Sequence, residues 1–518
     1  MRIPNIKFSA CLLGMALLAV SCRGVVADSA VDEIPAIWPD YKEVVIPWSI
    51  VPLNFSCTED FSTCLNAISG DVSIQKKAKD GLFRFSRKEW NALISASDTL
   101  SMTLMAKREG VWVSYKPFNM YVSRDAIDPW ISYRLIPPGY QGWKSMGLFQ
   151  RELGSYRQKA IIENGATADN CLNCHSYPNR NPDKMLFHVR SDFGGTMLIR
   201  EGEIEKLDTK TDSTISALVY PYWHPSEKYI AFSVNTTLQS FFNHNPNRIE
   251  VFDKASDVVL YDVDAHELHW SPLTKSPGRF ETFPTFSPDG RWLYFCSAEA
   301  VENMPADYDK VKYALMRIEF NPDNCSFGDK LETVFDAPAF GKSVSFPRIS
   351  PDGRFLAFTL HDYGNFSIWH KDADICLLDL ESGEMLEEPL MNSSDVDSYH
   401  SWSSNGRWLL FSSRRDDGLY TKLYISHIDA DGHASKPFLL PQEDPRDFYH
   451  DLMFSYNIPE FMSAEMPVPS RTIVKAVREL KGKKIKSDKS NDDILPTYLA
   501  QCLDCAVYAR YHFLCVGH

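Results

Sequence analysis

The sequence has no excess of positive charge. Its 518 residues include 54 Lys and Arg against 68 Asp and Glu, a formal net charge of −14. A broad basic face is incompatible with this balance, so a nucleic-acid partner is excluded. The basic run "RELKGKKIKSDK" (478–489) is interpreted as a solvated tail. A hydrophobic content of 44% with 13% aromatic residues is typical of a globular, strand-rich protein, and the length predicts two or three domains.

Long apolar runs are also lacking after the first 22 residues, so no transmembrane helix is expected. Within residues 1–22, Arg2 and Lys7 precede an apolar run (8–20) that is too short to span a bilayer, which predicts a signal peptide. "LLAVSC" (17–22) resembles a bacterial lipobox, which implies lipidation of Cys22. We therefore expect a cell-envelope lipoprotein of the outer membrane, on its periplasmic or surface face, held only by its acyl chains. Plain secretion with cleavage near Ala27 is the alternative.

Cysteines are few but informative in an exported chain. Cys57 and Cys64 are spaced for a local disulfide. Three others lie on strand-like segments as buried thiols or one bridge with a remainder: Cys296, Cys325 and Cys376. Residues 476–518 are expected to form a poorly ordered tail. A zinc site within that tail is the alternative, with Cys502, Cys505, His512 and Cys515 as ligands.

The segment Cys171-Leu-Asn-Cys174-His175 is a C-x-x-C-H motif. Two thiols at this spacing form thioethers with the vinyl groups of one haem, and the histidine that follows directly places its imidazole under the iron. The motif predicts one covalent haem c, with Cys171 and Cys174 as anchors and His175 as axial ligand. Three other interpretations remain open: a thioredoxin-like redox pair, a Cys171–Cys174 disulfide, and a zinc site of His175 and His188.

A haem at this position needs a sixth iron ligand. His188 is the favoured candidate, and Met185 or Met197 are the alternatives; a histidine gives a lower potential than a methionine. Each also has an ordinary interpretation as a buried strand residue. Arg190 lies two residues beyond His188, on the same side of a strand, where it is a candidate contact for a haem propionate.

An internal repeat occupies the second half of the sequence. Each copy is an apolar strand, a tight turn and a second strand: "YPYWHPSEKYIAFSV" (220–234), "FPTFSPDGRWLYFCS" (283–297), "FPRISPDGRFLAFTL" (346–360) and "YHSWSSNGRWLLFSS" (399–413). Further strand-like runs separate the copies, which favours four-stranded blades. The hairpins resemble the "SPDGRxLxF" repeat of TolB-type propellers, which implies a mainly β fold with a TolB-like β-propeller of five or six blades over residues 185–475.

Two regions precede this repeat. Residues 30–138 contain strand-like runs separated by turns, which predicts a small β-sandwich-like domain. Residues 139–184 are expected to form a short helical segment that carries the C-x-x-C-H motif, with a helix over 142–165. No Gly-x-Ser-x-Gly elbow occurs and no region remains for an α/β domain, so a propeller-capped peptidase is excluded.

Beyond its repeats, the chain resembles a group of Bacteroidetes-type TolB-like lipoproteins that carry a cytochrome c motif. The resembling segments are "IPWSIVPLNF", "AIDPWISYRLIPPGY", "MGLFQREL", "CLNCHS" and "MLFHVRSDFGGT". The resemblance implies an electron carrier or redox sensor rather than a substrate-converting enzyme, with the propeller as docking platform for a redox partner protein. The alternative is a non-catalytic, protein-binding propeller in the envelope, in which the haem is absent or structural.

Overall fold

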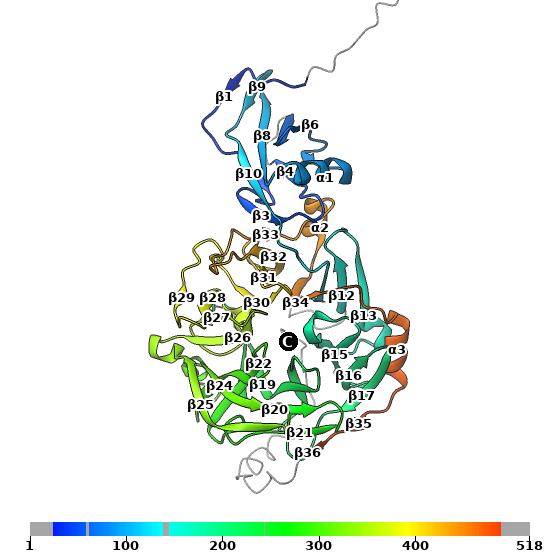
Figure 1. Cartoon of the computed structure of the whole chain (residues 1–518), viewed down its shortest axis with the longest axis vertical. Helices are drawn as coiled ribbons and strands as arrows, with labels where there is room; N and C mark the ends of the chain where they lie inside the picture. Colours follow the sequence, from blue (N-terminus) through cyan, green and yellow to red (C-terminus); the bar gives the residue numbers. More distant parts are fainter. Residues whose placement is uncertain (1–23, 58–61, 138–144, 243, 488–518) are drawn as a thin grey trace, which may run out of the picture.

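The computed structural model describes residues 24–57, 62–137, 145–242 and 244–487. The predicted lipidation site Cys22 and the alternative zinc site of Cys502, Cys505, His512 and Cys515 lie outside this range. In Figure 1 a ring of sheets surrounds a common centre, and a smaller domain that contains the first strands projects from one side of the ring. Among the described residues, no helix combines the length and apolarity that crossing a bilayer requires.

Six sheets of four strands, or four strands and a short fifth, form the ring within the described residues. The innermost strand of each sheet contacts the innermost strand of the next, so the sheets are the blades of a propeller. Blades 1 to 5 follow the chain. Blade 1 consists of β14 Leu172–Ser176, β15 Lys184–Val189, β16 Gly195–Arg200 and β17 Glu203–Asp208, and blade 2 of β18 Leu218–Trp223, β19 Tyr229–Phe241, β20 Ile249–Asp262 and β21 Glu267–His269. Blade 3 consists of β22 Arg279–Phe286, β23 Trp292–Glu299, β24 Ala314–Asn321 and β25 Ser326–Phe335, and blade 4 of β26 Ser343–Ile349, β27 Phe355–His361, β28 Asp374–Asp379 and β29 Met385–Leu386. Blade 5 consists of β30 Asp397–Trp402, β31 Trp408–Ser413, β32 Lys422–His427 and β33 Phe438–Leu439.

Blade 6 is built from two distant parts of the chain. Its innermost strand is β34 (Ser455–Met462), which pairs antiparallel with β11 (Trp130–Ile136); β12 (Gly147–Glu152) and β13 (Gln158–Glu163) complete the sheet. The propeller therefore begins at Trp130, upstream of the predicted start at residue 185. This arrangement joins the beginning and the end of the ring through backbone hydrogen bonds.

The expected helix over 142–165 is not formed, and neither is a helical segment around the C-x-x-C-H motif. β12 and β13 occupy the first region, and the motif lies on β14. β12 is paired on both edges and mostly buried. A strand buried on both faces does not alternate apolar and polar residues, so its sequence can imitate helical spacing.

The tight turns between the first two strands explain the repeated "SPDGR" motif. In blade 3 the Ser287 hydroxyl donates to Asp289 Oδ1 at 2.5 Å and accepts from the Trp292 N–H, while Asp289 Oδ1 accepts from the Arg291 N–H. Gly290 has φ +72°, a conformation that glycine adopts at low cost. Blade 4 repeats these contacts with Ser350 and Asp352. The motif is thus a self-capped hairpin turn.

The N-terminal domain contains a seven-stranded sheet, a three-stranded sheet and one helix, where the sequence predicts only a small sandwich of strands. Helix α1 (Arg87–Ala96) packs on β5, β6 and β8, and starts at a capping box of Ser86 and Glu89. The strands are β1 Ser29–Ala30, β2 Ile37–Trp38, β3 Val44–Pro47, β4 Phe55–Cys57, β5 Thr63–Ser69, β6 Val72–Lys77, β7 Leu82–Phe83, β8 Thr99–Arg108, β9 Val111–Ser114 and β10 Phe118–Ser123.

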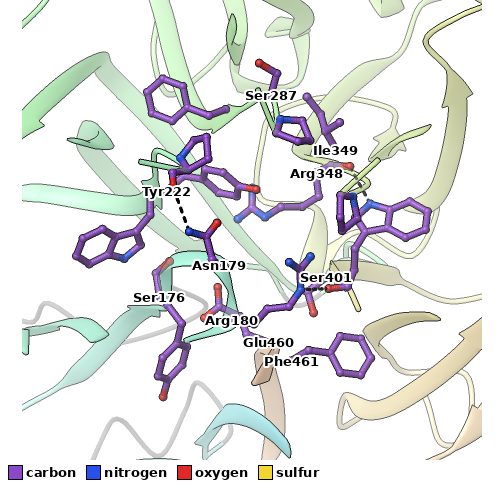
Figure 2. Close-up of a pocket in the computed structure, with 17 residues that line it drawn as sticks. Ser176, Asn179, Arg180, Tyr222, Ser287, Arg348, Ile349, Ser401, Glu460 and Phe461 are labelled. Atoms are coloured by element: carbon purple, nitrogen blue, oxygen red, sulfur yellow. Dashed lines mark hydrogen bonds between the residues drawn. The ribbon is translucent and has the colours of Figure 1, made fainter. Parts of the chain in front are cut away.

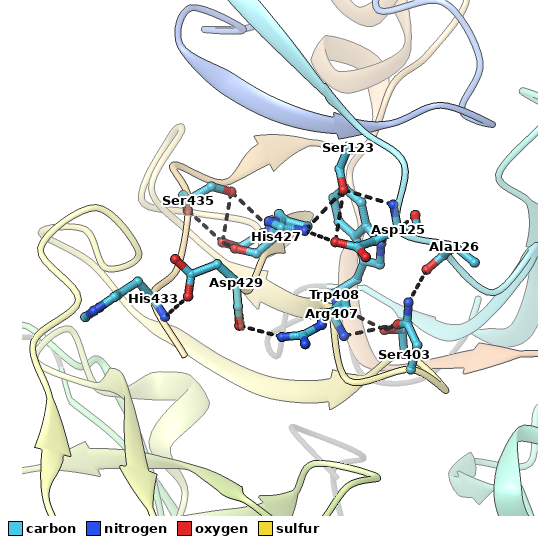
Figure 3. A network of polar contacts seen from close by, with 12 residues as sticks. Ser123, Asp125, Ala126, Ser403, Arg407, Trp408, His427, Asp429, His433 and Ser435 are labelled. Atoms are coloured by element: carbon cyan, nitrogen blue, oxygen red, sulfur yellow. Dashed lines mark hydrogen bonds and ion pairs between the residues drawn. The ribbon is translucent and has the colours of Figure 1, made fainter. Parts of the chain in front are cut away.

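A short connection after β10 fastens this domain to blade 5 (Figure 3). Asp125 Oδ2 lies 2.7 Å from His427 Nε2, and the Ser123 hydroxyl lies 3.2 Å from the same nitrogen. Although burial opposes it, the hydrogen bond from His427 lowers the pKa of Asp125. The Asn405 amide also donates to the Ala126 carbonyl at 2.7 Å. One continuous apolar core includes side chains from both this domain and blade 5, so the two are rigidly joined.

The remaining elements cover the ring. Helix α2 (Pro445–Asp451) precedes β34, and α3 (Ser470–Glu479) packs against β13 and β17. Short strands β35 (Lys483–Lys484) and β36 (Lys486–Ser487) add to the outer edges of blades 1 and 2. Residues 476–487, which the sequence assigns to a poorly ordered tail, are therefore part of the folded propeller. Where the structure is described, the 3₁₀ turns are η2 Asn164–Thr167, η3 Pro178–Arg180, η4 Tyr308–Lys310, η5 Ala337–Phe340 and η6 Ser367–Trp369.

The expected disulfide between Cys57 and Cys64 is not present. The two residues lie on β4 and β5, which belong to different sheets. Cys296, Cys325 and Cys376 are thiols, so the bridge considered among these three is not formed.

Candidate functional site

The innermost strands share a feature at mid-length. In each of the six, two residues fall within a shift of the pairing register, that is, a β-bulge. The first of the two has φ between +45° and +54° in every blade, and all six first residues belong to one apolar cluster: Cys174, Tyr220, Phe283, Phe346, Tyr399 and Ile458. We call these residues the axial ring.

The second residue of the bulge is proline in four blades and histidine in two. The prolines are Pro221, Pro284, Pro347 and Pro459, and the histidines are His175 and His400. Cys174-His175 thus holds the position of an aromatic-proline pair in blades 2, 3 and 4. The C-x-x-C-H motif is the innermost strand of the first blade, and its last two residues are built into the axial ring.

A pocket of about 260 Å³ opens at the end of the axis where the innermost strands finish. Every blade contributes to its wall (Figure 2), with residues that include Ser176 and Arg180 from blade 1, Tyr222 from blade 2, Phe286 from blade 3, Arg348 from blade 4, Trp402 from blade 5 and Glu460 from blade 6. We call it the axial pocket. A site that every blade lines is held in shape by the whole propeller.

Two arginines and one carboxyl group supply the charge of the axial pocket. The guanidinium of Arg348 lies 4.0 Å from the ring centroid of Phe346 and 4.9 Å from that of Tyr222. Its Nη1 donates to the Pro347 carbonyl at 2.7 Å, and Arg180 Nε donates to the Trp402 carbonyl at 2.9 Å. Within the described residues neither arginine forms an ion pair.

Glu460 faces these arginines from β34. Burial raises the pKa of its carboxyl group to about 8, although Arg348 and Arg180 act in the opposite direction. Burial likewise lowers the pKa of Arg348. Glu460 Oε2, Ser401 Oγ and Trp223 Nε1 are buried polar atoms without a hydrogen-bond partner among the described residues. Buried polar groups are normally hydrogen-bonded, so these three atoms mark capacity for a ligand or water.

The loop that carries Arg180 into the axial pocket is strained. Asn179 and Arg180 have φ +48° and +62°, a left-handed conformation that costs a non-glycine residue energy. Contacts on both sides hold it: the Asn179 amide donates to the Pro225 carbonyl at 3.0 Å, and the Arg180 carbonyl accepts from the Ser463 N–H at 2.9 Å. The position of the Arg180 side chain is therefore determined by the fold.

The predicted haem ligands lie further along the axis. His175 is 2% exposed, burial lowers its pKa to about 3, and in the described part of the chain neither of its ring nitrogens has a hydrogen-bond partner. The Cys174 thiol is buried, and burial raises its pKa although Arg190 and Arg134 lower it. Cys171 takes part in a disulfide, and Cys174 is a thiol. The two cysteines are therefore not bonded to each other.

Among the described residues His175 makes a ring contact with Tyr177, at 6.0 Å between centroids, and the sixth-ligand assignment stays a prediction. His188 pairs with Asn173 and points toward blade 2, where its ring lies 6.1 Å from that of Phe232. Its Nδ1 is 2.7 Å from the Thr196 hydroxyl, and burial lowers its pKa to about 3. Met185 and Met197 pack in the apolar cluster of Leu172 and Tyr177, on the other face of the sheet.

The arginines and Glu460 were not predicted as site residues. Their signal lies in the repeat: the position after the bulge holds Ser176, Tyr222, Thr285, Arg348, Ser401 and Glu460, so two of six copies place a charge where the others are uncharged. Arg190, the predicted propionate contact, lies close enough to Cys174 and His188 to lower the pKa of each. Among the described residues no cluster of three or more His, Cys, Asp or Glu side chains suits a metal ion, which leaves the His175–His188 zinc site unsupported.

No known family model matches the sequence, and no curated protein does. Among solved structures, the chain is similar to TolB from Acinetobacter baumannii, with a TM-score of 0.40 and 11% identity over 73% of this chain and 85% of TolB. It is also similar to the β-propeller domain of the Trilobed protease from Pyrococcus furiosus, with a TM-score of 0.31 and 12% identity over 67% of this chain and 96% of that domain. Dipeptidyl peptidase 4 from Porphyromonas gingivalis gives a TM-score of 0.29 and 11% identity over 56% of this chain and 42% of the peptidase. The chain spans less than half of that peptidase.

Proposed function

We propose that this chain is a non-catalytic binding propeller of the cell envelope, which holds a segment of a partner protein in the axial pocket. One observation carries the proposal: all six blades converge on a pocket in which Arg180 and Arg348 face a single acidic side chain, Glu460, and form no ion pair within the described residues. Both arginines are half-buried, and a partly desolvated guanidinium is stabilised when an anion pairs with it. The envelope location rests on the predicted signal peptide and lipobox.

The walls of the axial pocket suit a bound side chain. Aromatic rings from several blades supply apolar surface, and Arg348 is oriented by stacking on Tyr222 and Phe346. Preorganised walls lower the entropic cost of binding, because little has to be ordered when the ligand arrives. Trp223 Nε1 and Ser401 Oγ remain available as hydrogen-bonding groups.

Selection from a displayed peptide library tests this proposal. The wild-type protein is expected to enrich a sequence motif that an Arg348→Met/Glu460→Gln variant does not enrich. An Arg291→Gln variant is the matched control, because Arg291 is an exposed residue of the blade 3 turn. Equal enrichment by the wild type and the pocket variant would overturn the proposal, provided that both unfold at the same temperature.

A second candidate function is electron transfer or redox sensing through one covalent haem c. The observation in its favour is His175, a buried, neutral histidine with neither ring nitrogen occupied within the described residues, directly after Cys174. This donor set fits the group: Cys171 and Cys174 would hold it and His175 would be the axial ligand. Haem would supply a one-electron redox centre. Arg134 and Arg190 lie near Cys174, where they would face propionates. Attachment consumes both thiols and so excludes the disulfide at Cys171.

A pyridine haemochrome spectrum tests this second candidate. The protein is exported in cells that mature c-type cytochromes, and a Cys171→Ala/Cys174→Ala variant is the control. A c-type spectrum that survives denaturation and is absent from the double variant supports the candidate. A colourless, folded protein sinks it and leaves the binding propeller.

A further inference from the structure

Resting on the proposed binding function, the geometry points to a carboxylate attached to an apolar body, such as the C-terminal residue of a protein chain, as the group that the axial pocket recognises.

The charge of the axial pocket comes mainly from Arg180 and Arg348. Two other arginines donate to a side-chain oxygen: Arg415 pairs with Asp397 at 2.6 Å, and the buried Arg134 donates to the Asn457 side chain at 3.1 Å. The buried Arg151 instead donates to two backbone carbonyls. Arg180 and Arg348 also donate to backbone carbonyls, but unlike Arg151 they line the axial pocket. Guanidinium groups form their strongest hydrogen bonds with carboxylates and phosphates, and the carbonyl contacts leave donors of both arginines for an anion.

Glu460 shares the axial pocket with the two arginines. When its carboxyl group is ionised, the two arginines exceed it by one charge, which a monoanion neutralises. When it is protonated, which its raised pKa favours at neutral pH, its O–H can donate to a bound carboxylate. A phosphate dianion would instead meet repulsion from the ionised form. A monoanionic carboxylate is compatible with both states.

The walls and the volume of the axial pocket limit what the anion can be attached to. Aromatic side chains line the pocket next to the arginines, among them Tyr222, Phe286 and Trp402, so the bound anion carries an apolar body. A volume of about 260 Å³ lies just below the usual range for drug-sized ligands, roughly 300–1,000 Å³. One terminal residue is commensurate with this space, whereas a nucleotide or an oligosaccharide is too large. The C-terminal residue of a protein chain combines a carboxylate, an apolar side chain and this size.

Calorimetry with two probes, N-acetyl-L-phenylalanine and its amide, tests the inference. The acid is expected to bind at least tenfold more tightly than the amide, and Arg348→Gln or Arg180→Gln to remove that preference, while Arg291→Gln retains it. Inorganic phosphate as a competitor should displace the acid weakly. Equal binding of acid and amide would overturn the carboxylate inference while leaving peptide binding intact. Displacement by phosphate at equal concentration would also overturn it, and failure to bind any terminal or internal peptide segment would overturn the proposed function as well.

Discussion

Cys174 in blade 1 and Tyr399 in blade 5 occupy equivalent positions in the axial ring. Both have φ +51°, both lie in the bulge of an innermost strand, and each is followed by a buried histidine. The equivalence separates two roles of the C-x-x-C-H motif. Its Cys-His end occupies the bulge that every blade contains, whereas the presence of a second cysteine, Cys171, three residues before Cys174 distinguishes blade 1.

Proline is expected to be tolerated at the two histidines of the bulges. Four blades already have proline there, and the bulge residues lie outside the ladder register. His175→Pro and His400→Pro should each change the free energy of unfolding by less than about 1 kcal/mol, whereas Asn173→Pro, within the paired part of β14, should cost about 3 kcal/mol. Urea denaturation measures all three. Loss of the fold in His175→Pro would contradict the equivalence of the six bulges.

The buried histidines should make the protein sensitive to acid. Burial lowers the pKa of His175, His188 and His400 to about 3 each, below the ordinary value near 6.5 of the unfolded chain. The unfolded state therefore binds more protons between pH 6.5 and 3, so stability is present above pH 6.5 and falls as the pH drops. Each histidine contributes a slope of up to about 1.4 kcal/mol per pH unit.

Urea denaturation at pH 7, 5.5 and 4.5 measures this dependence. His400→Pro, which keeps the fold in the expectation above, should reduce the slope by the contribution of one histidine. An unchanged slope would show that His400 binds a proton as readily in the folded protein as in the unfolded chain, which would contradict the lowered pKa.

The carboxyl group of Glu460 should have the opposite effect on stability, which it lowers as the pH rises. Its pKa is raised to about 8 in the folded protein, above the value near 4.3 of an unfolded chain, so the folded state retains a proton that the unfolded state releases. The stability from this group is complete below about pH 4 and is lost as the pH rises toward 8. Glu460→Gln should remove the part of the pH dependence that corresponds to the release of about one proton on unfolding. Urea denaturation of the wild type and the variant between pH 5 and 8 measures this difference. A wild-type slope in the variant would refute the assignment.

Asn405 explains why the blade 5 turn departs from the "SPDGR" pattern. Its Oδ1 accepts from the Arg407 N–H, as Asp352 Oδ1 accepts from the Arg354 N–H in blade 4, but its amide also donates to the Ala126 carbonyl. Asn405→Asp would place a carboxylate against that carbonyl, and we expect a cost of roughly 1–3 kcal/mol. The matched Asp352→Asn change should cost less. Thermal unfolding compares the two, and equal costs would contradict the role of the amide.

Blades 2 to 5 could be predicted from sequence because their hairpins are local. Ser287 and Asp289 make their capping contacts within one turn, so the short motif identifies blades 3 and 4, and the flanking apolar strands identify the variant turns of blades 2 and 5. Blade 1 carries "CHSYPNRNPDKMLF" in the equivalent place, where no Asp-Gly or Asn-Gly turn marks the hairpin. Blade 6 has no local signal, because β34 pairs with β11 from the other end of the ring.

The candidate site was predicted only in part. The motif of Cys171, Cys174 and His175 is recognisable because its residues are contiguous. The axial pocket gathers Arg180, Arg348 and Glu460 from three blades, and their meeting depends on how the blades are placed around the axis. The sequence could not show whether His175 and His188 lie on the same face of the sheet, because that depends on a β-bulge in β14 that shifts the pairing register by one residue.

The closure of blade 6 has a consequence for how the chain matures. β11, β12 and β13 present an unpaired edge until β34 is available, and an open strand edge is a site for misassembly. During synthesis this edge stays unpaired until the residues of β34 are made, which follow those of the other five blades in the chain. The N-terminal domain, already in contact with blade 5 through Asp125 and His427, is placed to keep the two halves of the last blade within reach of each other.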